Sequence, residues 1–137
     1  MNRYLCFKYE PKYLSSNEDD NEKFQRETDY SVSVIKQKVD LSEESLVLDF
    51  GCGMGRVSRE LINKFNCKVI GVDISPSMLT FAKLYTANIS KFTGTHDYST
   101  PESIDVILSI FALQHAEDPK KEIDTIVSVL KPKGIFI

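Results

Sequence analysis

The chain of 137 residues has the length of one domain, and a domain of this size buries about two thirds of the surface of its unfolded chain. Twenty acids and 17 bases give a net charge of −3, and neither sign forms a long run, which disfavours a protein that binds nucleic acid through a basic face. No apolar stretch approaches the about 18 residues of a membrane span, and the N-terminus lacks the apolar core of a signal peptide. We therefore expect a cytoplasmic protein that binds neither nucleic acid nor a membrane.

The first 30 residues differ from the rest of the chain. Aromatic residues are frequent up to Leu14, and a polar stretch over residues 15–22 then predicts a loop or a disordered link. We therefore divide the chain into an N-terminal aromatic and polar segment, residues 1–30, and a domain over residues 31–137.

A helix is predicted from about Thr28, where the apolar residues recur at the spacing of one helical face: Val32, Ile35 and Val39. The apolar residues 46–48 predict a first strand, which ends on Asp49. Three alternating glycines follow directly, and they are Gly51, Gly53 and Gly55. Since glycine tolerates positive φ and has no Cβ, such a turn lets a ligand approach the backbone closely. A dinucleotide-binding fingerprint would space its glycines as G-x-G-x-x-G instead.

A second strand and two helices are predicted around the next acid. Helical spacing follows the glycine turn, at Val57, Leu61 and Phe65. The strand over residues 68–72 ends on Asp73, 22 residues after Gly51, where an acid in a Rossmann-like sheet accepts hydrogen bonds from ribose hydroxyls. Ser75 is expected to cap the next helix, with Pro76 at its first position. One face of this helix is expected to hold Met78, Phe81, Ala82 and Tyr85.

The later elements complete an α/β pattern. A third strand is predicted within residues 89–95, a fourth over residues 105–109, and a last helix capped by Asp118, with residues 131–134 at its end and a fifth strand from Gly134. Right-handed crossovers place these strands in the order 3-2-1-4-5, with helices on both faces of the sheet. This arrangement is a three-layer α/β fold with a Rossmann-like sheet. The fifth strand would then be an uncovered apolar edge, through which two copies could form a homodimer.

Four segments, in order and spacing, resemble the class I S-adenosylmethionine-dependent methyltransferases. They are D-F-G-C-G-M-G from Asp49, G-V-D-I-S-P-S-M from Gly71, I-D-V-I-L-S-I-F-A-L-Q-H from Ile104, and V-L-K-P-K-G from Val129. The resemblance covers about residues 40–137 and implies a sheet that lacks the last two strands of the family's seven. It also implies S-adenosylmethionine as methyl donor, a small molecule as acceptor, and an N-terminal segment that is either a lid or an aromatic anchor to the sheet.

The resemblance implies a donor site at the carboxyl ends of the first two strands. Asp73 would bind the ribose hydroxyls or cap the following helix. The three glycines would admit the amino-acid end of the donor, and Asp49 would accept from its ammonium group or from amides of the turn. Cys52 is either a reactive thiol or, as we favour, a small residue that the turn accommodates. The three cysteines of the chain, with no C-x-x-C spacing, predict neither a disulfide framework nor a metal site.

The adenine of the donor needs apolar contacts and a polar partner. Ile74 and Met78 are the expected apolar contacts, although Met78 fits equally well as core filler. The adenine amino group would bind Asp97, with His96 and Tyr98 as alternatives.

The acceptor side of the site is expected after the fourth strand. Ser109 would lie at the floor of the reaction site, and His115 would remove a proton from the acceptor or would only pack at the start of the next loop. No N/D-P-P-Y/F sequence follows this strand, which disfavours methylation of nucleobases or glutamine. Two alternatives stay open: a domain that binds S-adenosylmethionine or S-adenosylhomocysteine without catalysis, and an NAD-dependent oxidoreductase, against which the glycine spacing argues.

Overall fold

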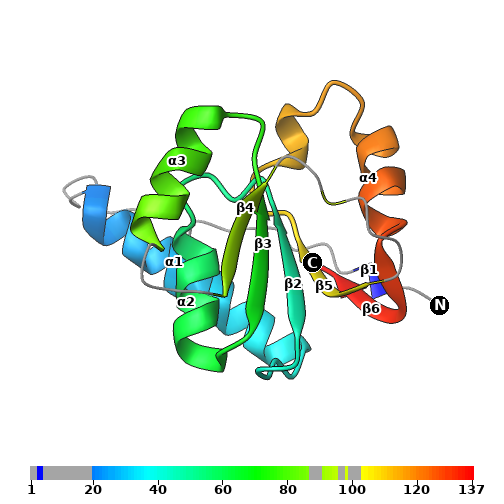
Figure 1. Cartoon of the computed structure of the whole chain (residues 1–137), viewed down its shortest axis with the longest axis horizontal. Helices are drawn as coiled ribbons and strands as arrows, with labels where there is room; N and C mark the ends of the chain where they lie inside the picture. Colours follow the sequence, from blue (N-terminus) through cyan, green and yellow to red (C-terminus); the bar gives the residue numbers. More distant parts are fainter. Residues whose placement is uncertain (1–2, 5–19, 87–90, 96–97, 99–102) are drawn as a thin grey trace.

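The computed structural model describes residues 3–4, 20–86, 91–95, 98 and 103–137. Within these residues, the fold is built on a parallel sheet with the strand order β1-β6-β5-β2-β3-β4 (Figure 1). The strands are β1 (Arg3–Tyr4), β2 (Leu46–Phe50), β3 (Lys68–Val72), β4 (Phe92–Thr95), β5 (Ile104–Leu108) and β6 (Leu130–Phe136). The five predicted strands are β2 to β6, in chain order. Read from β4 to β6, they lie in the predicted order 3-2-1-4-5, so the expected Rossmann-like sheet is confirmed.

Helices cover both faces of this sheet, as a three-layer α/β fold requires. They are α1 (Asp20–Lys38), α2 (Arg56–Phe65), α3 (Pro76–Tyr85) and α4 (Pro119–Val127), with the 3₁₀ turn η1 (Leu113–His115) before α4. Figure 1 shows α1 and α2 on one side of the sheet and α4 on the other. No helix in the described part of the chain is both long and apolar enough to cross a membrane.

Two helices begin at the predicted caps. The Oγ of Ser75 accepts a hydrogen bond of 3.3 Å from the backbone N–H of Met78, and Pro76 is the first residue of α3. The carboxylate of Asp118 accepts from the backbone N–H of Lys121 at 3.1 Å and so caps α4. Because these side chains satisfy N–H groups that the helix itself leaves unpaired, they fix where each helix starts.

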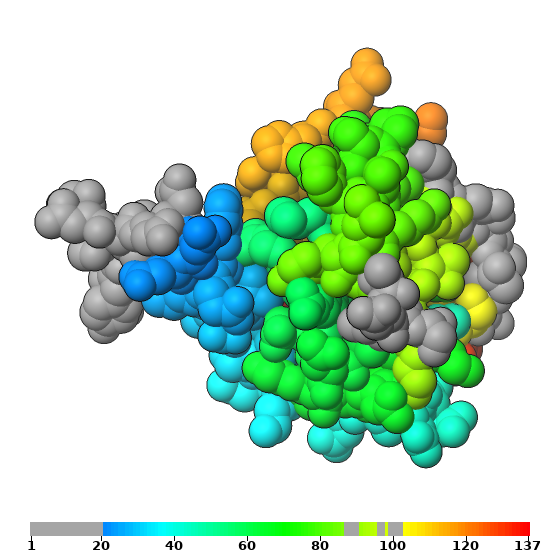
Figure 2. All heavy atoms as spheres, turned by 60° about the vertical axis from the view of Figure 1, so that its left-hand side comes forward, coloured from blue at the N-terminus to red at the C-terminus, as the bar shows by residue number. Residues whose placement is uncertain are grey.

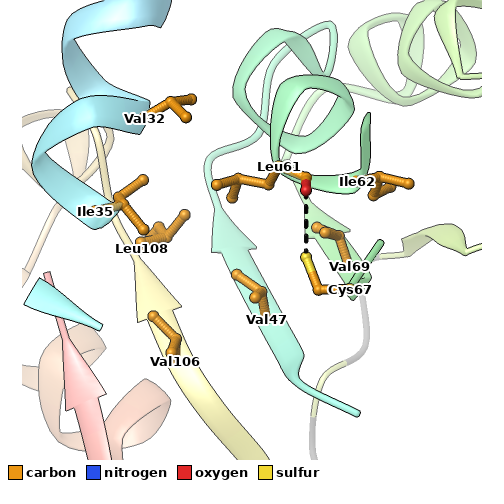
Figure 3. Close-up of a cluster of buried hydrophobic side chains, with 9 residues drawn as sticks. All are labelled: Val32, Ile35, Val47, Leu61, Ile62, Cys67, Val69, Val106 and Leu108. Carbon is orange, nitrogen blue, oxygen red and sulfur yellow. Dashed lines mark hydrogen bonds between the residues drawn. The ribbon is translucent and has the colours of Figure 1, made fainter. Parts of the chain in front are cut away.

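The core between the sheet and the helices α1 and α2 is made of aliphatic side chains and one cysteine (Figure 3). Its buried members are Val32, Ile35, Val47, Leu61, Ile62, Cys67, Val69, Val106 and Leu108. On the opposite face, a second cluster lies under α4 and holds Leu48, Val72, Ile104, Ile107, Ile126, Val129, Leu130 and Phe136. Successive side chains of a strand point to opposite faces, so β2 contributes to both cores, as its apolar sequence predicts.

Helix α1 begins earlier than predicted. It starts at Asp20, whereas the apolar spacing placed the start at about Thr28. The additional turns contain Glu, Lys and Gln residues, which are good helix formers but show no apolar periodicity when they face solvent. Part of the polar stretch over residues 15–22 is therefore helical, and the boundary that we drew at residue 30 falls inside α1.

The buried face of α3 also differs from the prediction. Ala82 is buried as expected, but the second buried residue is Leu79, whereas Phe81 is 57% and Tyr85 is 39% exposed. Apolar residues at positions 78, 79, 81, 82, 84 and 85 cover more than half of this helix, so their spacing does not define a single inward face.

Strand β6 begins at Leu130, before the predicted start at Gly134. Its register with β5 pairs Ile104 with Leu130 and then Val106 with Ile135, so residues 131–134 form an irregularity within the strand and not the end of α4. A break in the pairing register of this kind leaves no local periodicity by which the sequence would reveal it.

The expectation that the fifth strand is an uncovered edge is wrong. Strand β1 pairs with it in parallel, with Arg3 opposite Ile135 and Tyr4 opposite Phe136. The backbone groups of β6 that we expected to be free are thus partly satisfied by the N-terminal end of the same chain. A homodimer that paired through Ile135 and Phe136 would have to displace β1.

Candidate functional site

The glycine turn after β2 is held against the end of β3. The backbone N–H groups of Gly51 and Cys52 donate to the carbonyl oxygen of Val72, at 2.7 and 2.9 Å. The three glycines all have positive φ, at 79° for Gly51, 54° for Gly53 and 83° for Gly55, which explains why glycine stands there. Gly55 precedes α2 and has no side chain that could cap this helix. The backbone N–H of Ser58 in the first turn donates to Asp49, and the other N–H groups at this helix start suit an anionic ligand group.

The surroundings of the three glycines differ. A Cβ at Gly51 would overlap the Cβ of Ala112, and one at Gly55 would lie 3.4 Å from the Cβ of Ala82. A Cβ at Gly53 would meet no atom of the described residues within 4 Å. Gly51 and Gly55 therefore let the turn pack against neighbouring elements, whereas Gly53 faces open space that a ligand could enter.

The carboxylate of Asp73 joins this turn to α3. Its Oδ2 accepts a hydrogen bond from the backbone N–H of Gly53 at 2.9 Å, and its Oδ1 accepts from that of Ser75 at 2.8 Å. An ionised carboxylate has about four lone-pair sites, so two remain for further donors such as a pair of ribose hydroxyls. Asp73 thus supports the start of α3, the alternative role for this residue, and also lies beside the open side of Gly53.

Asp49 lies beneath the turn and faces α2. It is buried, and its Oδ2 accepts a hydrogen bond of 2.6 Å from the hydroxyl of Ser58, which is also buried. Burial raises the pKa of Asp49 to about 6; the hydrogen bond from Ser58 opposes this rise, and the charge of Asp73 adds to it. The sequence analysis did not identify Ser58 as a partner of Asp49. The signal that could have revealed it is a hydroxyl side chain among the apolar residues on the inward face of α2.

Cys52 is almost fully buried in the turn. Its Sγ donates a weak hydrogen bond to the carbonyl oxygen of Gly53 at 3.6 Å. Burial, together with the negative charges of Asp49 and Asp73, raises the pKa of this thiol. A thiol with a raised pKa stays protonated at neutral pH and is a poor nucleophile. The surroundings therefore favour the interpretation as a small structural residue over that of a reactive thiol.

Apolar side chains are exposed directly after Asp73. Ile74 is 93% exposed and Met78 is 42% exposed, so Met78 is not the core filler that we considered. Phe81 and Leu84 continue this apolar surface along α3, which lies on the face of the molecule shown in Figure 2. Exposed apolar side chains beside a turn that can admit a ligand suit contact with a flat, apolar ring.

The end of β5 lies next to the end of β2. Asp49 pairs with Leu108 in the sheet, and Ser109 follows that pair directly. The Oγ of Ser109 is buried and has no hydrogen-bond partner among the described residues. A buried hydroxyl without a partner costs free energy, so this atom is a candidate for a ligand contact. Phe111 holds a positive φ of 59°, a strained conformation that clusters at functional sites.

His115 lies three residues after Ala112, the residue of this segment that is next to the turn. It ends η1, which begins directly after Ala112, the residue that packs against Gly51. Its ring is exposed, and its Nε2 lies 3.1 Å from the Nε2 of Gln114. The segment is therefore in place beside the turn.

The residues expected at the adenine amino group are only partly described. Asp97 and His96 lie outside the described residues. Tyr98 packs edge-on against Phe50, with ring centroids 5.8 Å apart, and belongs to the margin of the core under α4. Burial raises the pKa of Tyr98, with the charge of Glu122 adding to the rise. Tyr98 thus has a packing role.

Known proteins resemble this chain in sequence and in fold. The family model for the methyltransferase domain matches residues 48–137. The sterol 24-C-methyltransferase of Candida albicans is 29% identical over 126 residues, which cover 84% of this chain and 33% of that protein. The chain thus spans about a third of the length of this curated relative.

Two solved structures share the fold. A protein of Galdieria sulphuraria, whose assignment as a sarcosine dimethylglycine methyltransferase is provisional, has a TM-score of 0.78 and 23% identity, over 88% of this chain and 48% of that chain. Phosphoethanolamine N-methyltransferase 2 of Haemonchus contortus, in complex with phosphomonomethylethanolamine and S-adenosylhomocysteine, has a TM-score of 0.71 and 27% identity, over 78% of this chain and 27% of that chain.

The family match begins within β2 and therefore includes the glycine turn, Asp73 and the end of β5. It removes the NAD-dependent oxidoreductase from the alternatives, in agreement with the glycine spacing. The chain therefore belongs to the class I S-adenosylmethionine-dependent methyltransferase domain family.

Proposed function

We propose that this chain binds S-adenosylmethionine and supports methyl transfer from it to a small-molecule acceptor. The observation behind this proposal is the hydrogen bond between the N–H of Gly53 and Oδ2 of Asp73. It holds a carboxylate with spare acceptor sites next to the open side of the glycine turn. Family membership and the ligand of the Haemonchus contortus enzyme support the same donor.

We assign partners to the main parts of the donor. Asp73 would accept from the ribose hydroxyls, and the open side of Gly53 would admit the amino-acid end, whose carboxylate suits the start of α2. Ile74 and Met78 would contact the adenine faces, and Asp97 would bind the adenine amino group. The buried hydroxyl of Ser109 would find in the donor the partner that it lacks among the described residues.

The reaction itself needs alignment more than activation. A lone pair of the acceptor attacks the methyl carbon, the carbon–sulfur bond breaks with its electrons going to sulfur, and the acceptor loses a proton. Holding both reactants in line and excluding water supplies most of what a protein can add. We assign the removal of the proton to His115, because imidazole is an effective general base near neutral pH and its segment packs against the turn.

The second candidate function is binding of S-adenosylmethionine or S-adenosylhomocysteine without catalysis. One observation favours it: the matched region covers 33% of the sterol methyltransferase, so most of that enzyme lies outside the match. The donor site described above is contained within the match, whereas contacts to an acceptor need not be.

Two measurements on the wild-type chain test these functions. Calorimetric titration with S-adenosylhomocysteine is expected to show saturable binding, and titration with NADH is expected to show none. A turnover assay that detects S-adenosylhomocysteine, run with sterol and amine acceptors, separates methyl transfer from binding alone. Binding without turnover on every acceptor would favour the second candidate, and no binding would refute both.

A further inference from the structure

Arg56 connects the glycine turn to α1, a contact that sequence analysis did not predict. It is the first residue of α2 and follows Gly55 directly. Its Nη1 donates hydrogen bonds to the carbonyl oxygen of Phe24 at 2.8 Å and to Oγ1 of Thr28 at 3.1 Å. Its guanidinium also lies over the ring of Phe24, with Cζ 4.6 Å from the ring centroid.

This set of contacts suits arginine in particular. A guanidinium group has a flat face that stacks on an aromatic ring and N–H donors in its plane, so it can contact the ring and both acceptors together. The ammonium group of lysine is compact and has no such face. Thr28 is a well-fixed acceptor, because it is buried and its own hydroxyl donates to the carbonyl oxygen of Phe24 at 2.8 Å.

The two halves of α1 are held differently. Val32 and Ile35 anchor the second half in the core. Between residues 21 and 30, Thr28 is the one buried residue. The ion pair between Lys64 and Asp29, at 4.0 Å, joins two half-exposed side chains and contributes little in water. Arg56 therefore gives the first half of α1 a defined attachment to the turn.

We propose that Arg56 is a positioning residue that couples donor binding in the glycine turn to the order of the first half of α1. The proposal rests on the function proposed above. A donor seated against Gly53 restricts the turn, and this restriction passes through Gly55 to Arg56 and its contacts on α1. Such coupling is reciprocal, so whatever loosens α1 weakens donor binding, and donor binding orders α1.

The test compares two arginines of α2. Arg59 lies one turn after Arg56, and its guanidinium is 4.3 Å from the ring centroid of Tyr85 on α3, so it makes a similar contact that does not involve α1. In calorimetric titrations with S-adenosylhomocysteine, we expect Arg56→Met to weaken binding about tenfold or more. We expect Arg59→Met to change it by less than about threefold. Arg56→Lys should not restore full affinity, because it keeps the charge without the planar fork.

Hydrogen exchange separates coupling from a general loss of stability. We expect S-adenosylhomocysteine to slow amide exchange over residues 22–30 in the wild-type and Arg59→Met chains, but not in Arg56→Met. Thr28→Val removes one of the two acceptors of Arg56 with little change of shape. It should therefore partly reduce the protection of residues 22–30 by S-adenosylhomocysteine. This variant also provides the test if Arg56→Met does not fold.

The possible failures are distinguishable. If Arg56→Met binds as tightly as Arg59→Met, or if the ligand still protects residues 22–30 in Arg56→Met, the coupling is refuted while the proposed function stands. If the wild-type chain does not bind S-adenosylhomocysteine, the proposed function is refuted, and the coupling with it.

Discussion

The backbone N–H of Gly53 donates a 2.9 Å hydrogen bond to the carboxylate of Asp73, and this bond joins the turn after β2 to the end of β3. The two strands are neighbours in the sheet, with Phe50 opposite Val72, so both loops leave the sheet side by side. Contacts within the chain thus hold the turn and the acid in place. Preorganisation of this kind reduces the free-energy cost of binding.

Removal of the carboxylate at Asp73 is expected to weaken donor binding. Each hydrogen bond to a charged group contributes about 1.5–3 kcal/mol, so Asp73→Ala should raise the dissociation constant for S-adenosylhomocysteine about 10- to 100-fold. Asp118→Ala is the matched control, because Asp118 also accepts from a helix-start N–H but lies at α4. Both variants should be less stable in urea, and only Asp73→Ala should lose affinity in calorimetry. Unchanged affinity would remove Asp73 from the site.

Substitutions of Gly53 and Gly51 should separate binding from folding. Asn tolerates positive φ better than other side chains, and a side chain at Gly53 meets open space, so Gly53→Asn should keep the fold and abolish donor binding by occlusion. Gly51→Ala should instead destabilise the fold, because its Cβ overlaps Ala112. Thermal unfolding and calorimetric titration of both variants check this. Normal titration of Gly53→Asn would contradict the assignment of the open side to a ligand.

Burial of Asp49 predicts a pH-dependent cost to stability. The pKa of Asp49 is raised from 3.8 to about 6 in the folded chain. Between pH 3.8 and pH 6, the folded state therefore holds a proton on Asp49 that the unfolded state has lost. The contribution of Asp49 to the free energy of unfolding is therefore fully present below pH 3.8, and it is lost as the pH rises through about 6. The difference of about two pH units corresponds to about 3 kcal/mol.

Asp49→Asn should remove this cost while keeping an acceptor for the hydroxyl of Ser58. In urea unfolding, we expect the variant to be more stable than the wild type at pH 7.5, by up to about 3 kcal/mol, and to differ little at pH 4. The same change in stability at both pH values would rule out the buried charge as its cause.

The hydroxyl of Ser109 should have opposite effects on stability and on binding. Because its Oγ is buried without a partner in the described structure, Ser109→Ala should raise the free energy of unfolding by about 1 kcal/mol or more. If the donor supplies the missing partner, the same variant binds S-adenosylhomocysteine more weakly. Urea unfolding and calorimetry on one preparation measure both. A gain of stability with unchanged affinity would leave Ser109 outside the donor site.

A proton-removing role for His115 predicts a loss of rate without a loss of donor binding. His115→Gln should reduce turnover by about 100-fold or more, with unchanged affinity for S-adenosylhomocysteine. Gln114→Ala is the control, because it removes the side chain that contacts the His115 ring and leaves the imidazole in place. Similar losses of turnover in both variants would point to a packing role for His115.

Local chemistry allowed much of the site to be predicted. The glycine turn, the acid at the end of β3 and the caps Ser75 and Asp118 were all predicted, and the structure confirms the caps and the positions of the turn and the acid. Each depends on a property of one residue or of its near neighbours, such as the φ freedom of glycine or a side chain that satisfies a helix-start N–H.

By itself, the sequence determined the order of strands and helices, the place of the turn and the acid that faces it. The tertiary structure alone decided which glycine borders open space, that Ser58 bonds to Asp49, that Leu79 is buried on α3 while Phe81 is exposed, and that β1 pairs with the edge of β6. The reason is physical: the first set follows from backbone freedom and apolar periodicity within a short segment. The second set depends on which atoms of separate elements meet when the layers pack, and no local pattern records such contacts.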